Sequence, residues 1–134
     1  KGGIIIADRY TTSNMVHQMT KYDDEKERMQ FLSWLEKTEY EELELPRPDL
    51  VILLDIPLGI SEALVKARAA EGGSMDIHEQ HLDYLRKCHD AYQALVRLYG
   101  WERILCVKEG ALRSVADIGR DVDEAVEKAM NPMK

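Results

Sequence analysis

An acid and a base stand side by side near the start of the 134-residue sequence, directly after an apolar run. The run, Gly3–Ala7, predicts a strand that is buried on both faces of a parallel sheet. Ligands of such sheets bind beyond the carboxyl ends of the strands, where Asp8 and Arg9 would lie. Arg9 could hold a phosphate with forked hydrogen bonds, and Asp8 could contact a magnesium ion or orient the arginine. A surface ion pair at a strand end is the alternative interpretation.

The next predicted helix, from about Ser13 to Lys21, carries side chains that can form hydrogen bonds with the edge of a nucleobase. It carries the hydroxyl of Ser13 and the amides of Asn14 and Gln18. His17 comes nearly one helical turn after Asn14, so both can face the same cleft. The alternatives are that Ser13 and Asn14 cap the helix and that His17 lies on a solvated face.

A third set of polar residues surrounds a glycine-containing loop over residues 69–77. A basic helix end at Arg68 precedes this loop, and the next helix begins with Asp76, His78 and Glu79. A flap of this kind with a basic residue can close over phosphates and exclude water, which predicts a lid. The alternative is that the acids only stabilise the start of their helix. Asp55, at the end of another apolar run, is interpreted as a turn former.

Elements that would position these groups alternate along the chain. Apolar runs predict strands at Gly3–Ala7, Leu50–Ile56 and 103–107, and helical spacing predicts helices at about 13–21, 23–43, 60–70, 78–98 and 114–130. Strands that alternate with helices predict an α/β fold with a parallel sheet and flanking helices in a single domain over residues 1–134. Three strands are few for such a sheet, so we expect an element to be missing.

The amino-acid composition argues against several classes of function. Acidic residues outnumber basic ones by 25 to 18, and the net charge of −7 disfavours nucleic acid as a partner. Cys88 and Cys106 predict no disulfide framework and no zinc site, and both should pack as small apolar residues. No stretch is long and apolar enough for a membrane span, and no signal peptide is visible. A cytoplasmic location is therefore expected.

Three segments together resemble thymidylate kinases, which phosphorylate thymidine monophosphate from ATP. They read DRYTTSNMVHQ, WLEKTEYEELELPRPDLVILLDIP and KARAAEGGSMDIHEQHLDYLRKCHDAY, and the match runs in order over nearly the whole chain. The resemblance implies a P-loop kinase fold of three α/β/α layers, incomplete at its N-terminus. It also implies a Mg²⁺ cofactor, ATP as co-substrate and a homodimer. Phe31 and Trp34, which lie beyond the apolar stripe of the helix at 23–43, could form the dimer contact or pack within the domain.

The same resemblance implies roles for individual residues. Arg9 would bind the acceptor phosphate, and Asp8 would help to organise it with magnesium. Ser13 and Asn14 match positions that contact thymine, and His17 matches a position, commonly tyrosine, that lies against the sugar. The remaining positions implied to bind substrate or to act in catalysis are Tyr10, Gln18, Arg68, Asp76 and His78.

The sequence also departs from this family. No glycine is followed by lysine, so the phosphate-binding motif GxxxxGK[ST] does not occur in the chain. Residue 1 resembles the loop before the third strand of a longer kinase, and we expect the chain alone to be inactive. The missing first strand would lie between Gly3–Ala7 and Leu50–Ile56. The alternatives are a related deoxynucleoside kinase and a non-catalytic nucleotide-binding or interaction module.

Overall fold

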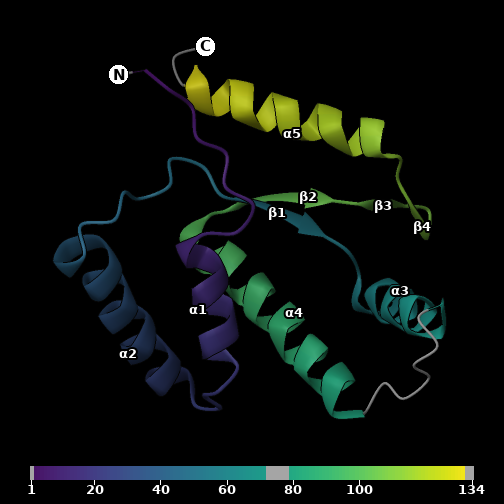
Figure 1. The fold of residues 1–134 in the computed structure, drawn as a ribbon, viewed down its shortest axis with the longest axis horizontal. Coiled ribbons are helices and arrows are strands. Elements are labelled where there is room, and N and C mark those ends of the chain that lie inside the picture. Colours follow the sequence, from purple (N-terminus) through teal and green to yellow (C-terminus); the bar gives the residue numbers. More distant parts are fainter. Residues whose placement is uncertain (1, 72–78, 132–134) are drawn as a thin grey trace. The chain divides into compact units, whose positions relative to one another are not determined.

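The structure, a computed structural model, describes residues 2–71 and 79–131. The chain divides into two compact units, Lys1–Arg47 and Pro48–Lys134. Along the sequence the elements are α1 (Thr11–Met19), α2 (Glu25–Glu36), η1 (Lys37–Glu42), β1 (Ile52–Asp55), α3 (Leu58–Glu71), α4 (Glu79–Tyr99), β2 (Glu102–Leu105), β3 (Val107–Lys108), β4 (Ala111–Leu112) and α5 (Val115–Met130) (Figure 1). No helix within the described ranges has both the length and the apolar character that crossing a membrane requires.

The first unit is helical. Asp24 caps α2, because its carboxylate accepts a hydrogen bond from the Glu27 backbone N–H over 3.0 Å. The helix predicted at 23–43 changes its pitch at Lys37, and η1 is a π-helical turn. Helices α1 and α2 contact each other, and the buried apolar side chains of this unit are Met15, Val16, Met19, Leu32 and Leu35.

The strand predicted at Gly3–Ala7 is not formed, so this sequence prediction is wrong. These residues have no regular secondary structure, and Ile5 and Ile6 are 91% and 90% exposed. A strand requires a neighbouring strand to satisfy its backbone N–H and C=O groups. The described part of the first unit contains no strand, and among the described residues of the second unit β1 pairs with β2 alone. The β-branched residues give this segment a preference for a strand but no partner for one.

The second unit is built on a parallel pair of strands, as the sequence predicts for an α/β protein. Strand β1 pairs with β2 in a register that sets Asp55 opposite Leu105. Both strands are shorter than predicted. Helix α5 contacts β2 and α3 contacts α4 (Figure 1). The buried apolar side chains are Cys88, Ala91, Leu95, Ile104 and Cys106, and burial raises the pKa of both thiols. The prediction that the cysteines pack as apolar residues is therefore confirmed.

A short hairpin after β2 was not predicted from the sequence. Strands β3 and β4 pair antiparallel across Glu109 and Gly110. Both of these residues have positive φ angles, 51° and 77°, which a type I′ turn requires of its two central residues. The hairpin returns the chain to the end of β2, where the Arg113 backbone N–H donates to Cys106 O over 2.9 Å.

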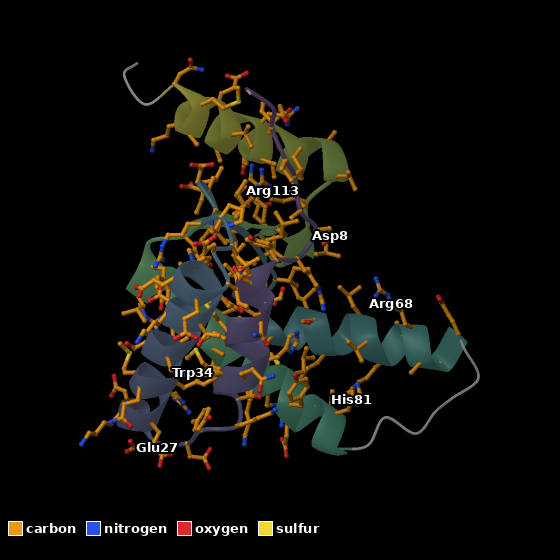
Figure 2. The ribbon with its side chains drawn as sticks, turned by 60° about the vertical axis from the view of Figure 1, so that its left-hand side comes forward. Asp8, Glu27, Trp34, Arg68, His81 and Arg113 are labelled. Carbon is orange, nitrogen blue, oxygen red and sulfur yellow. The ribbon has the colours of Figure 1, made fainter. Side chains whose placement is uncertain are left out.

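Hydrogen bonds of Arg113 link the start of α5 to the end of β2, and Figure 2 labels this residue. Its guanidinium donates to Asp117 Oδ2 and Asp121 Oδ2, both over 2.7 Å, and to the Leu105 carbonyl over 2.8 Å. Ser114 caps the helix by accepting from the Asp117 backbone N–H over 3.1 Å. These bonds fix the direction in which α5 leaves the hairpin.

Candidate functional site

Arg9 occupies a strained backbone position one residue before the N-cap of α1. Asp8 and Arg9 form a bend, and both are exposed. The φ angle of Arg9 is 70°, in the left-handed region that favours glycine. A non-glycine residue held there costs about 1–3 kcal/mol, and such strain is concentrated at functional sites. The bend places an unobstructed guanidinium and a carboxylate at the start of a helix.

Two hydroxyl groups tie the start of α1 to the segment that follows α2. The Tyr10 hydroxyl donates to the Pro46 carbonyl over 2.9 Å, and the hydroxyls of Thr11 and Tyr40 lie 2.7 Å apart in a hydrogen bond. Burial raises the pKa of Tyr40 above its ordinary value of 10.0. The Arg47 guanidinium lies over the Tyr40 ring, 4.2 Å from its centroid. These contacts hold the helix that follows Arg9.

Asn14 makes the third link between the same two segments. Its Nδ2 donates to Glu39 Oε1 over 3.2 Å. Glu39 lies on the π-helical turn η1 and is only 8% exposed, whereas Asn14 is exposed. Glu39 was not identified from the sequence. Its position continues the buried stripe of Leu32 and Leu35 at helical spacing, and an acid in such a stripe is the signal that could have revealed it.

The other predicted residues of this group lie along α1. Neither Ser13 nor Asn14 caps the helix, since the cap position belongs to Tyr10. Ser13 is half-buried, and His17 lies on the helix one turn beyond Asn14, as predicted. The Gln18 amide oxygen accepts from Lys21 Nζ over 2.7 Å. The first unit therefore carries the predicted site residues from Asp8 to Gln18.

A buried carboxylate at the end of β1 forms a second polar cluster. Asp55 is 6% exposed, and its two oxygens accept from Arg103 Nε over 2.6 Å and from Gln93 Nε2 over 2.9 Å. His89 Nε2 lies 4.0 Å from the same carboxylate. The interpretation of Asp55 as a turn former is therefore wrong, because its side chain joins β1 to α4 and β2. Neither Gln93 nor Arg103 was identified from the sequence, since their partner is distant in the chain.

Of the predicted lid, the structure places only Arg68 and its neighbours. Arg68 is exposed in the last turn of α3, which extends to Glu71 (Figure 2). Asp76 and His78 lie outside the described residues, as do positions 72–77 of the loop predicted at 69–77, and Glu79 is the first residue of α4. Among the described residues no three acidic, histidine or cysteine side chains gather as metal ligands.

Comparison with known proteins finds relatives over nearly the whole chain. The chain is 31% identical over 122 residues to a probable thymidylate kinase of Pyrococcus abyssi, a match that covers 91% of this chain and 51% of that protein. It is 27% identical over 130 residues to a probable thymidylate kinase of Pyrobaculum aerophilum, covering 97% of this chain and 57% of that protein. These similarities confirm the resemblance to thymidylate kinases.

The match covers only part of each relative's length. The chain spans about half the length of the curated relatives it matches. No family model matches the chain, and no solved structure matches it.

Proposed function

We propose that the intact protein transfers a phosphoryl group from ATP to thymidine monophosphate and yields thymidine diphosphate. The observation that carries this proposal is the similarity to probable thymidylate kinases over 91% or more of the chain. The exposed Arg9 at the start of α1 supports it, because a guanidinium there is suited to a phosphate monoester. In this proposal the chain supplies the acceptor site of a nucleotide kinase with the three-layer P-loop fold.

The proposed roles follow the order of residues along the bend and α1. Arg9 holds the acceptor phosphate with a forked pair of hydrogen bonds. The strained backbone at Arg9 directs its guanidinium towards this phosphate. Asn14 and Ser13 face the thymine, while His17 lies against the deoxyribose. Tyr10 and Gln18 complete the substrate contacts, and the hydrogen bond from Tyr10 to Pro46 holds this stretch in place.

Asp8 fits the requirement of a magnesium ion that is bound together with ATP. Magnesium in nucleotide kinases keeps several waters and is held by one or two carboxylates and the substrate phosphates. The exposed carboxylate of Asp8, next to the proposed phosphate ligand, can supply one such contact directly or through water. When bound, the ion would neutralise phosphate charge during transfer. Arg68, with Asp76 and His78, is proposed to act from the lid.

The phosphates of ATP need donors that the 134 residues do not supply as a GxxxxGK[ST] motif. We therefore propose the intact protein as the enzyme and expect no turnover from this chain alone, because phosphoryl transfer depends on positioning and charge stabilisation. We also propose that the intact protein is a homodimer. Trp34 on α2 supports this, since 59% of its surface is exposed.

An acceptor panel tests the proposed function. The intact protein is assayed with ATP and magnesium for ADP formation on thymidine monophosphate, thymidine and deoxycytidine monophosphate. We expect the highest kcat/KM on thymidine monophosphate. Faster use of thymidine would identify a deoxynucleoside kinase instead. Binding of thymidine monophosphate without turnover would identify a non-catalytic nucleotide-binding module.

A further inference from the structure

The contact between Asn14 and Glu39 fixes which end of the asparagine amide faces outward. A carboxylate oxygen accepts hydrogen bonds, so Glu39 Oε1 pairs with the NH₂ group of the amide and not with its oxygen. Asn14 Nδ2 lies 3.2 Å from Glu39 Oε1 in this arrangement. The amide oxygen, Oδ1, therefore points away from Glu39, and because Asn14 is exposed this oxygen can accept a hydrogen bond from a ligand.

Glu39 occupies a place where packing alone would favour an apolar side chain. It continues the stripe of Leu32 and Leu35, both at least 95% buried, and is itself 8% exposed. Its second oxygen, Oε2, is buried without a hydrogen-bond partner among the described residues. A buried polar atom without a partner costs free energy and calls for an explanation. The bond from Asn14 to the other oxygen, Oε1, accounts for a carboxylate at this position, since an apolar side chain could not fix the orientation of the amide.

We infer that Glu39 is a positioning residue that makes Asn14 an acceptor towards the base of the substrate. This inference rests on the proposed function. The ring nitrogen N3 of thymine carries a hydrogen and donates, whereas N3 of cytosine is an acceptor. An outward Asn14 oxygen therefore pairs with thymine and repels cytosine, because two acceptors then face each other. Glu39 thus contributes to base selectivity without touching the substrate.

The hydrogen bonds next to Asn14 keep the geometry fixed enough for such discrimination. Thr11 is bonded to Tyr40, the residue adjacent to Glu39, at 2.7 Å. The same face of α1 is thus joined twice to η1, once by a hydroxyl pair and once by the amide–carboxylate pair. The amide of Asn14 cannot turn over without leaving the Glu39 carboxylate opposite its own oxygen.

The test is the ratio of kcat/KM for thymidine monophosphate to that for deoxycytidine monophosphate, measured with the intact protein. Glu39→Gln keeps the shape but lets either end of the Asn14 amide face outward, because glutamine offers both a donor and an acceptor. We expect the ratio to fall roughly tenfold, the effect of one favourable hydrogen bond replaced by an opposed pair. Glu41→Gln, an exposed acid on the same turn, is the matched control and should leave the ratio unchanged.

Two further measurements separate orientation from a general structural effect. The ratio between thymidine monophosphate and deoxyuridine monophosphate should not change in Glu39→Gln, because both bases donate from N3. The double variant Asn14→Asp with Glu39→Gln should restore the preference for thymine over cytosine. In it the carboxylate accepts from the new amide and presents its other oxygen to the base.

The outcomes distinguish the two proposals. If the wild-type protein does not phosphorylate thymidine monophosphate, the proposed function fails, and this inference fails with it. If the wild-type protein prefers thymine and Glu39→Gln keeps that preference, the inference alone is overturned. Equal losses on both acceptors, unrescued by the double variant and accompanied by a lower melting temperature, would show that Glu39 is only structural and would also overturn it.

Discussion

Arg9 and Glu39 illustrate how single residues depart from what their surroundings favour. Arg9 holds a φ angle of 70° that glycine would adopt without strain, and Glu39 is a carboxylate on an otherwise apolar stripe. Each departure costs stability. Both lie in the first unit, on either side of Asn14 in the sequence, and both are explained if this unit binds the acceptor nucleotide.

His17 provides a prediction about the sugar. It lies one turn beyond Asn14 on α1, on the side proposed to face the deoxyribose. His17→Ala would remove the side chain that crowds a 2′-hydroxyl, so activity on the ribonucleotide acceptor relative to the deoxyribonucleotide should rise roughly tenfold. The measurement is kcat/KM of the intact protein on both acceptors. An unchanged preference for the deoxyribonucleotide would show that another residue selects the sugar.

At the scale of elements, local patterns predicted the helices better than the strands. Asp24 and Ser114 cap α2 and α5 as their residue types suggest, and the helix ends lie within a few residues of the predicted ones. Gly3–Ala7 has the composition of a buried strand but lacks a pairing partner among the described residues of its unit, and composition cannot supply one. The pitch change into η1 also has no simple sequence signal, although it accompanies the burial of Glu39.

The polar clusters show the same difference between local patterns and distant contacts. That Asp8, Arg9 and the polar residues of α1 lie near one another was predictable, because they are close together in the sequence. The Asp55 cluster was not, because Gln93 and Arg103 are 38 and 48 residues away from Asp55. The parallel pairing of β1 with β2 brings Arg103 to Asp55, and Gln93 reaches the same carboxylate from α4.

The start of α5 predicts how stability depends on pH. Hydrogen bonds from Arg113, and then from Arg120, lower the pKa of Asp117 from 3.8 to about 2. A carboxyl group whose pKa is lower in the folded state stabilises the protein above pH 3.8, and this contribution is lost as the pH falls towards 2. Asp117→Asn should therefore lower the urea midpoint at pH 7, and the difference from wild type should shrink below about pH 4.

The control for this prediction is Asp123→Asn, an exposed acid on the same helix. It should change the urea midpoint little at either pH. A difference between wild type and Asp117→Asn that is equally large at pH 7 and at pH 2.5 would contradict the electrostatic origin of the effect.

At the scale of the whole molecule, the exposed face of α2 bears on assembly. Trp34 is 59% exposed, and its ring lies 5.9 Å from that of Phe31, which itself stacks on Tyr22. Phe31 thus packs within the first unit, while most of Trp34 is left uncovered. Met29, on the same helix, is also 45% exposed. These apolar side chains are suited to contact with a second copy.

Sedimentation of the intact protein tests this assembly. We expect a dimer at micromolar concentration, and Trp34→Glu should shift it towards the monomer by placing a charge in the contact. Glu27→Gln, at an exposed position on the same helix, should leave the dimer intact. A wild-type protein that sediments as a monomer would contradict the dimer, and a dimer unaffected by Trp34→Glu would place the contact elsewhere.

The acceptor role of Arg9 is tested most directly by ADP formation in the presence of thymidine monophosphate, measured for the intact wild-type protein and for Arg9→Ala. Loss of charge-assisted hydrogen bonds worth about 1.5–3 kcal/mol should lower kcat/KM for thymidine monophosphate roughly 10- to 150-fold. The KM for ATP should change little, because Arg9 is proposed to touch only the acceptor, and Arg9→Lys should recover part of the loss. Turnover of thymidine monophosphate that is unaffected by Arg9→Ala, or an equal loss of affinity for both substrates, would contradict the proposed acceptor site.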